Sequence, residues 1–351
     1  MRMEENQTAR PKKRRGCGIG CLIFVVILIG FGRLVMQAVV EIAQEGRGGR
    51  WQGFFSRASG GDDVGEDEAP SMVETWSAGN GDVKVVRIPV EGVITLNEGR
   101  WHGGNANTVL RSIRRATHDP EVRGLILEIN SGGGGITDSD IIYHALMRFK
   151  DADANRVIVS IFGDTAASGA YYIALASDCI LAHPTTLTGS IGVVLQTYNV
   201  KELAQKLGVQ DVTIKSGANK DMLNPFQDVS PEQRAMLQGV IAAMHDRFVS
   251  LVAKHRGLPK DTVAPLADGR VFVAQEALMH QLIDGIGYAE DAQAKIAELL
   301  EAEDGVRIYR YSEQVTLMDL LSRPGFGMQL DLKRLLQGEA ARPGLKYEWS
   351  F

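Results

Sequence analysis

The chain has 351 residues, a formal net charge of −5 and 44% hydrophobic residues, enough apolar material for one large or two small folded domains. Charged residues make up 23%, close to the globular average, which argues against wholesale disorder. The mild acidity, with no basic stripe beyond the N-terminus, argues against nucleic acid as a partner. Three cysteines cannot form a disulfide framework. No Cys/His cluster indicates zinc, so we expect no metal site.

The N-terminal region has the pattern of a membrane anchor. Residues 1–16 are polar and end in a basic run, and residues 17–40 form a long apolar segment with Arg33 as its one charge. This segment is long enough to cross a hydrocarbon core of about 30 Å. A cleaved signal peptide would have a shorter apolar region and an A-x-A-like exit, so we interpret 17–40 as a transmembrane helix in contact with lipid.

The basic cluster before the apolar segment predicts the orientation of the chain. Positive residues favour the cytoplasmic side of a membrane. The chain is therefore expected to be a single-pass protein of the inner or plasma membrane, with everything after residue 40 on the periplasmic or extracellular side. Residues 41–81 are rich in Gly, Ser, Asp and Glu and are expected to form a flexible linker.

From residue 82 strand-like and helix-like segments alternate. The expected strands are 83–94, 124–130, 156–163, 178–184, 189–196 and 211–217. The expected helices are 105–119, 138–150, a helix opening at Ser168, 199–208 and 231–256. This order predicts an α/β domain with mostly parallel strands over residues 82–302. Residues 303–351 are weakly patterned and read as a C-terminal extension. Cys179 lies in a strand-like stretch, where we expect a buried, inert thiol.

Four consecutive glycines, residues 132–135, follow the expected strand 124–130. Glycine lets the backbone approach a ligand closely, and ligands of open α/β sheets bind at the carboxyl ends of the strands. The chain has no GK[ST] and no GxGxxG motif, which disfavours a phosphate cradle. An oxyanion hole fits better if a nucleophile lies nearby. The alternative is a flexible turn.

Ser168 stands among small residues at a predicted strand-to-helix junction. A hydroxyl at a helix N-terminus lies where negative charge is stabilised, and the N–H of Gly169 could face a reacting carbonyl oxygen. The alternative is a plain N-cap serine, whose side chain satisfies a helix N–H. Local sequence alone favours the N-cap.

A serine nucleophile needs a base, and the segment 215–221 carries Lys220. Lysine can serve only when neutral, which burial favours; otherwise a lysine in a loop is a solvated charge. None of the seven histidines lies in a recognisable triad motif, and the chain has no GxSxG elbow. Only His183, which follows an expected strand, is a tempting alternative base.

From about residue 83 to 290 the chain resembles the S49 serine peptidases, the family of signal peptide peptidase A. The matching segments, in the order of the family, are LEINSGGGG (127–135), TAASGAYYIALASD (165–178), TLTGSIGV (186–193), KSGANKD (215–221), NPFQDVSPEQR (224–234), ADGRVF (267–272) and LIDGIG (282–287). A single copy that holds both the serine and the lysine matches the short form of the family. Ala170 and Gly132 depart from the glycine and proline often found there, and neither change removes a backbone N–H.

The resemblance implies a crotonase/ClpP-like fold with Ser168 as nucleophile and Lys220 as general base. It also implies oxyanion donors at Gly169 and at Gly133 or Gly134, while Ser190 is a candidate for orienting the lysine. The implied protein is a membrane-anchored serine endopeptidase for apolar peptides such as remnant signal peptides. This chemistry needs no cofactor.

The resemblance to the short form further implies a ring-shaped homo-oligomer with active sites near subunit boundaries. We therefore predict that Lys220 of one protomer serves Ser168 of its neighbour; the alternative is a pair within one chain. Three alternatives remain open: an S49 membrane protease with a specific protein substrate, a crotonase-type enzyme that binds acyl-CoA, and a non-catalytic membrane scaffold on the same fold. The intact pair Ser168 and Lys220 argues against the scaffold.

Overall fold

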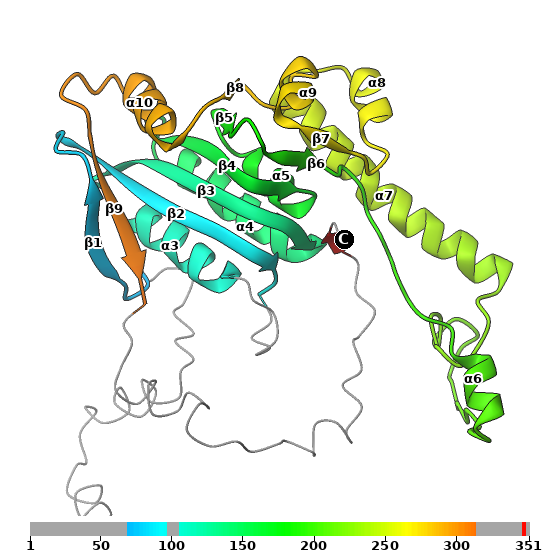
Figure 1. Ribbon diagram of the computed structural model, residues 1–351. Coiled ribbons are helices and arrows are strands. Elements are labelled where there is room, and N and C mark those ends of the chain that lie inside the picture. Colours follow the sequence, from blue (N-terminus) through cyan, green and yellow to red (C-terminus); the bar gives the residue numbers. More distant parts are fainter. Residues whose placement is uncertain (1–68, 97–104, 314–345, 349–351) are drawn as a thin grey trace, which may run out of the picture. The chain divides into compact units, whose positions relative to one another are not determined.

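The computed structural model describes residues 69–96, 105–313 and 346–348 (Figure 1). The basic segment 1–16, the expected span 17–40 and most of the expected linker lie outside these residues. Within the described part of the chain, no helix combines the length and apolarity that crossing a bilayer requires. The expected transmembrane helix therefore stays a prediction.

A sheet of mostly parallel strands forms the centre of the domain (Figure 1). In spatial order its strands are β1 (Val73–Ala78), β9 (Val306–Ser312), β2 (Val83–Ile94), β3 (Val122–Gly135), β4 (Val157–Ala167), β5 (Cys179–Ala182) and β8 (Gly285–Ile286). Off this path lie β6 (Leu187–Gly189), β7 (Val271–Val273) and β10 (Lys346–Glu348). The antiparallel pairs of the described strands are β1 with β9, β6 with β7, and β10 with β3. The predicted α/β class with mostly parallel strands is confirmed.

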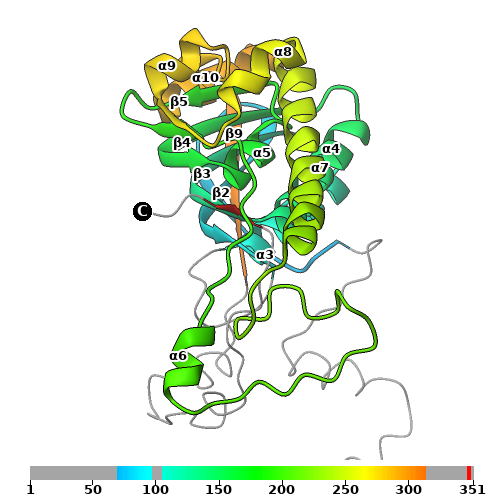
Figure 2. The same ribbon diagram turned by 90° about the vertical axis from the view of Figure 1, so that its right-hand side faces the viewer.

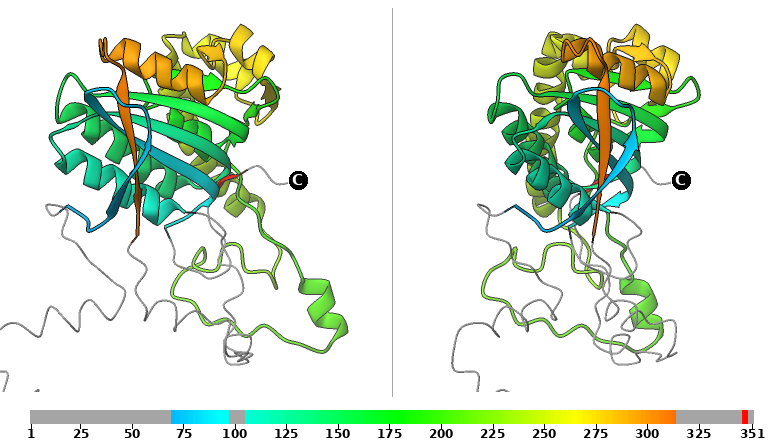
Figure 3. Two further views of the ribbon diagram at one scale, coloured as in Figure 1. Left: turned by 60° about the vertical axis from the view of Figure 1, so that its left-hand side comes forward. Right: turned by 90° about the vertical axis from the view of Figure 1, so that its left-hand side faces the viewer.

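Helices cover both faces of this sheet. The helices of the described residues are α3 (Ala106–His118), α4 (Ile136–Asp151), α5 (Gly169–Ala174), α6 (Lys201–Lys206), α7 (Pro231–Arg256), α8 (Lys260–Val263), the 3-10 helix η1 (Ala264–Leu266), α9 (Ala274–Met279) and α10 (Ala289–Leu299). Of these, α6 lies away from the sheet (Figure 1). Figure 3 shows α3 and α4 on one face of the sheet and α10 on the other. Residues alternate along β3 accordingly: Leu125 and Leu127 join the core under α3, α4 and α5, whereas Ile126 joins the core under α10.

The sheet extends past both ends of the range 82–302 expected for the domain. β1 falls in the expected linker 41–81, and β9 falls in the expected extension 303–351. β9 lies between β1 and β2, where Val306, Ile308 and Tyr311 are buried. Its interspersed arginines concealed this strand in the sequence.

Three expectations about strands were wrong. The glycine run is part of β3, which continues through Gly135 because β2 pairs with it as far as Gly134. Residues 211–217 form no strand: every one of them is exposed, and no strand lies beside them to supply a hydrogen-bonded partner. Of the expected strand 189–196, only Gly189 lies in a strand, as the last residue of β6.

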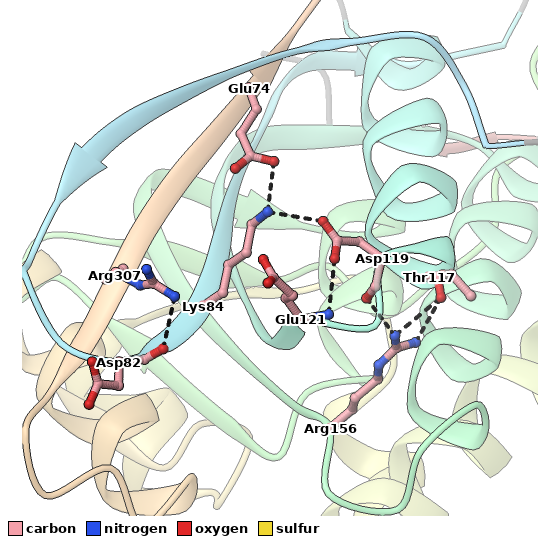
Figure 4. A network of polar contacts seen from close by, with 8 residues as sticks. All are labelled: Glu74, Asp82, Lys84, Thr117, Asp119, Glu121, Arg156 and Arg307. Carbon is pink, nitrogen blue, oxygen red and sulfur yellow. Dashed lines mark hydrogen bonds and ion pairs between the residues drawn. The ribbon is translucent and has the colours of Figure 1, made fainter.

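A buried ion-pair network ties the β1–β2 side of the sheet to the turn after α3 (Figure 4). Lys84 Nζ donates to Glu74 Oε2 at 2.8 Å and to Asp119 Oδ2 at 3.0 Å, and its side chain is only 7% exposed. Burial alone would lower the pKa of Lys84, but its hydrogen bonds to Glu74 and Asp119 outweigh that effect and raise the pKa. Arg156 completes the network by donating to the backbone carbonyls of Thr117 and Asp119.

Candidate active site

Ser168 occupies a tight turn between β4 and α5. Its backbone is at φ 56° and ψ −119°, and the residue is 1% exposed. A non-glycine residue at positive φ is strained and is often found at functional sites. Its side chain caps no N–H of α5. The plain N-cap interpretation is therefore wrong, and the structure gives the hydroxyl no capping role.

Backbone hydrogen bonds hold this turn from both sides. The N–H of Ser168 donates to the carbonyl oxygen of Gly189 at 2.8 Å, and the N–H of Tyr172 donates to the carbonyl oxygen of Ser168 at 2.9 Å. In the parallel pairing of β4 with β6, Ala167 lies opposite Gly189. Ser190 follows the last residue of β6 directly, so the register brings Ser190 alongside Ser168. Ser190 is itself at φ 49° and 7% exposed.

The glycine run lies on the other side of Ser168. In the β3–β4 pairing Ser131 lies opposite Ala166, so β3 passes Ser168 at the glycines that follow Ser131. Gly133 adopts φ +105°, and its N–H donates to Ser131 Oγ at 3.1 Å, while that hydroxyl donates to the Gly92 carbonyl at 2.6 Å. One expected oxyanion donor, Gly133, is thus already bonded in this structure. Sequence reasoning missed Ser131, which has no local motif that marks it.

Gly134 cannot carry a side chain in this geometry. A Cβ there would lie 2.1 Å from the carbonyl oxygen of Ile94 on β2. Gly169 is the first residue of α5, and the N–H of a first helical residue has no partner inside the helix. Among the expected oxyanion donors, Gly169 therefore has an N–H that α5 does not use.

β10 occupies the edge of β3 next to Ser168. It runs antiparallel to β3, with Lys346 opposite Gly135, Tyr347 opposite Gly134 and Glu348 opposite Gly133. Because β2 pairs with the other edge of β3, β10 takes over the edge that β4 leaves when it turns into α5 (Figure 1). This edge therefore accepts an extended polypeptide in antiparallel register.

Two tyrosines directly after the Ser-Gly-Ala turn anchor α5. The hydroxyl of Tyr171 donates to the Leu282 carbonyl at 2.8 Å, and that of Tyr172 donates to Asp140 Oδ1 at 2.6 Å. Burial raises the pKa of both phenols. The two adjacent tyrosines in the sequence could have indicated these anchors, but the sequence alone predicts only a helix there.

Lys220 lies apart from the residues gathered around Ser168. It belongs to residues 192–230, here called the arm, which connect β6 to α7 and contain α6 (Figure 2). Lys220 is exposed, and among the described residues its side chain forms no hydrogen bond or ion pair with Ser168. Its neighbour Lys215 is held by Asp221, with Nζ 2.7 Å from Oδ1. One chain thus brings together Ser168, Ser190 and the glycines, but not Lys220.

Histidine provides no alternative base in the described residues. The ring of His183 stacks against Tyr288 at 5.3 Å between centroids, His245 hydrogen-bonds the Ala267 carbonyl, and His255 hydrogen-bonds Tyr143. None of the described histidines hydrogen-bonds Ser168. Cys179 is buried as expected, and burial raises the pKa of its thiol to about 11, so it is inert at neutral pH.

Several known proteins with sequences similar to this chain are named as proteases. A protein of Enterococcus faecium named "Putative signal peptide peptidase SppA" is 40% identical over 223 residues, covering 62% of this chain and 64% of that protein. "Putative protease slr0021" of Synechocystis sp. is 37% identical over 216 residues, covering 62% of this chain and 74% of that protein. Protease 4 of Salmonella typhi is 33% identical and covers 64% of this chain. The chain spans 36% of that protein's length and less than two thirds of the Enterococcus protein's.

The fold was also compared with solved structures. A mutant of the membrane-bound stomatin-specific protease 1510-N is 17% identical, with a TM-score of 0.38, covering 62% of this chain and 86% of that one. The ClpP-like topology stays a prediction. The sequence match is decisive: Peptidase family S49 matches residues 150–303, the stretch that contains Ser168, Ser190 and Lys220. With this match and the Synechocystis relative, the chain belongs to peptidase family S49.

Proposed function

We propose that the protein is a serine endopeptidase in which Ser168 is the nucleophile and Lys220 is the general base. The observation that carries this proposal is the turn at Ser168. A strained, buried serine whose hydroxyl caps no helix N–H lies beside a strand edge that accepts an extended polypeptide. Strain of this kind is retained where it serves a function.

The reaction follows from these positions. Neutral Lys220 takes the proton from Ser168 Oγ, and the alkoxide attacks the carbonyl carbon of the scissile peptide. The N–H of Gly169 stabilises the oxyanion, together with an N–H of the glycine run other than that of Gly133, which donates to Ser131. The lysine then protonates the leaving amine, and water hydrolyses the acyl-enzyme. Ser190, brought alongside Ser168 by the register of β6, orients the lysine amine.

The substrate binds as an antiparallel strand along residues 133–135 of β3, in the position that β10 holds in this structure. Main-chain hydrogen bonds in this mode accept any extended sequence, and side-chain pockets select among them. Folded proteins cannot supply such a strand. The substrate class is extended apolar peptides such as remnant signal peptides, and the proposed anchor at residues 17–40 places the enzyme at the membrane where they occur.

The base comes from a neighbouring copy of the chain. Ser168 and Lys220 do not meet within one chain, and the arm exposes large apolar side chains: Val212 is 83% exposed and Ile214 is 97% exposed. Apolar residues gathered on a surface in this way mark a contact site. A neighbouring protomer that covers the arm would bury these side chains and remove Lys220 from water, which favours its neutral form. A ring of protomers repeats this contact and closes it.

Labelling with a fluorophosphonate tests the nucleophile on the full chain. Wild-type protein should be labelled at Ser168, and Ser168→Ala and Lys220→Ala should both lose the label. Lys215→Ala is the matched control, because Lys215 lies on the same arm but is paired with Asp221; it should retain the label. Wild-type protein that takes up no label would contradict the proposal and favour a scaffold.

Mixing subunits tests the shared site. Ser168→Ala and Lys220→Ala proteins, each inactive, are mixed under conditions where subunits exchange. Some rings should then combine an intact Ser168 with an intact Lys220, and peptide cleavage should return. If tagged subunits demonstrably exchange and no cleavage returns, the pair acts within one chain.

A further inference from the structure

A pocket of about 380 Å³ lies between α3 and α4, and no candidate active-site residue lines it. Leu110 and Ile113 of α3 and Ala145 of α4 form its apolar wall. The lining residues of each helix are spaced three or four apart, so they form one stripe per helix, and the two stripes face each other across the pocket. It is called the α3–α4 pocket below.

Basic side chains surround the α3–α4 pocket. Arg114 and His118 line it from α3, and His144 and Arg148 line it from α4. Among the described residues, the side chains of Arg114, His144 and Arg148 form no hydrogen bond or ion pair. His118 donates its Nδ1–H to the Arg114 carbonyl at 2.8 Å, which leaves its Nε2 available. The guanidinium groups of Arg114 and Arg148 carry positive charge without a counter-charge, so an anion between them is stabilising.

The one acidic residue that lines the α3–α4 pocket does not neutralise this charge. Asp140 Oδ1 lies 2.6 Å from Arg247 Nη2 on α7 and accepts the hydroxyl of Tyr172 at 2.6 Å. Arg247 therefore balances the charge of Asp140 from outside the pocket. The remaining rim is positively charged above an apolar wall, which suits an anionic group attached to a short apolar part.

We propose that the α3–α4 pocket binds a phosphate group, with Arg114 and Arg148 as its principal ligands. Guanidinium groups donate paired hydrogen bonds to phosphate oxygens, and the apolar wall accommodates the carbon atoms next to the phosphate. This site does not depend on the protease proposal, because it shares no residue with the Ser168 turn.

The course of the chain favours the phosphate of a lipid headgroup. Residues that follow the proposed anchor and linker enter the domain along α3: Arg111 donates to the Ser71 carbonyl at 3.5 Å, and the Ser112 hydroxyl lies 3.8 Å from Met72 Sδ. Arg114 lies one turn further along the same helix. The chain that leads from the membrane thus reaches the domain on the helix that lines the pocket.

Calorimetric titration of the full chain in a neutral detergent tests this site. The probes are dihexanoylphosphatidylglycerol, dihexanoylphosphatidylcholine and inorganic phosphate. Phosphatidylglycerol should bind saturably, and Arg114→Gln and Arg148→Gln should each weaken its binding about tenfold, since each removes charge-assisted hydrogen bonds. The matched control is Arg115→Gln, which removes the same charge from the next residue of α3 but does not line the pocket. It should leave the affinity unchanged.

The three probes distinguish a lipid phosphate from free phosphate. Phosphatidylglycerol binding more tightly than inorganic phosphate identifies a lipid ligand, and equal affinities with the same arginine dependence identify free phosphate; both support the site. Phosphatidylcholine should bind more weakly, because its ammonium group meets the cationic rim. The proposal is overturned if no probe saturates, if Arg115→Gln weakens binding as much as Arg114→Gln, or if phosphatidylcholine binds as tightly as phosphatidylglycerol.

Discussion

The backbone N–H of Ser168 donates to the carbonyl oxygen of Gly189 over 2.8 Å, so the conformation of the proposed nucleophile depends on a glycine in another strand. Gly189 adopts φ +87°, and a Cβ there would lie 2.6 Å from Cδ2 of Phe272. Both facts restrict this position to glycine. The N–H of Ser168 is occupied by this bond, and the N–H of Gly133 is bonded to Ser131, so the N–H of Gly169 is left to face the oxyanion.

Replacing Gly189 by alanine should therefore inactivate the enzyme while the domain still folds. The strained backbone and the displaced Phe272 should shift the Ser168 turn, and a displacement of about 1 Å near the chemistry costs about 100-fold in rate. Peptide cleavage and fluorophosphonate labelling measure the effect. Gly192→Ala is the matched control, because Gly192 is not at positive φ and a Cβ there would lie 3.3 Å from the Cα and 3.6 Å from the N of Gly269, farther than the 2.6 Å contact at Gly189. Comparable losses in both variants would contradict the proposed dependence.

Gly134 and Gly135 provide a second matched pair. Alanine at Gly134 meets the backbone of Ile94 at 2.1 Å, so β2 and β3 must separate, whereas alanine at Gly135 meets the side chain of Asp138 at 2.5 Å, which can rotate away. We expect Gly134→Ala to lose about 100-fold or more in cleavage rate, the size of effect seen when one oxyanion donor is lost. Gly135→Ala should remain active. Equal activities of the two variants would show that the β3 edge does not take part.

The occupation of the β3 edge by β10 predicts competition with substrate. Proline at Tyr347 removes a backbone N–H and disfavours strand pairing, so Tyr347→Pro should free residues 133–135 and lower the KM for a short peptide. Tyr347→Thr is the control, since threonine retains the N–H and favours a strand. A synthetic peptide of residues 345–351 should inhibit Tyr347→Pro competitively. An unchanged KM in Tyr347→Pro would mean that β10 and substrate bind at different places.

The Lys84 network predicts a pH-dependent contribution to stability. Lys84→Met leaves Asp119 buried without its partner, so the free energy of unfolding at pH 7 should fall by about 3 kcal/mol. Burial alone would raise the pKa of Asp119, but the hydrogen bond from Lys84, together with that from the Glu121 N–H, outweighs burial and lowers the pKa. Lys295→Met is the control, since its pair with Glu298 is solvent-exposed and should contribute less than about 1 kcal/mol.

The sign of each shift sets the pH window for this effect. Because the pKa of Asp119 is lowered in the folded chain, its contribution is present above the unfolded value of about 3.9 and is lost as the pH falls through the folded value. Because the pKa of Lys84 is raised, its contribution is present below about 10.4 and is lost as the pH rises through the folded value. Urea unfolding should show the full difference between wild type and Lys84→Met at pH 7 and a smaller one below pH 4. A difference that stays constant with pH would contradict this account.

The parts of the fold that were predicted correctly have local causes. The continuous apolar run in β3 indicated a strand buried on both faces. The bounds of α7 followed from Pro231 after the Ser230 cap, whose capping box with Gln233 is present, and from Gly257, which adopts the left-handed conformation that ends the helix. The turn at Ser168 was located from its small neighbours, although its positive φ was not predicted.

The parts that escaped prediction depend on partners distant in the sequence. The segment 211–217 has the composition of a strand but no neighbour to pair with, whereas the glycine run, which has strand-breaking composition, is held as a strand between β2 and β10. The bond of the Gly133 N–H to Ser131 depends on the local backbone path, which composition does not reveal. The separation of Lys220 from Ser168 could not be predicted, because it depends on the path of the whole arm.

The position of β9 has a consequence for the order in which the chain folds. Arg307, in β9, donates to the Asp82 carbonyl just before β2, a contact between residues 225 positions apart. While the chain is being synthesised, one edge of β2 therefore stays unpaired until residues 306–312 have emerged. Contacts this distant in sequence slow folding, and an open strand edge invites pairing with other chains. A chain that stops before residue 306 would leave this edge of β2 open to pairing with other chains, so the domain can complete its sheet only after β9 has been synthesised.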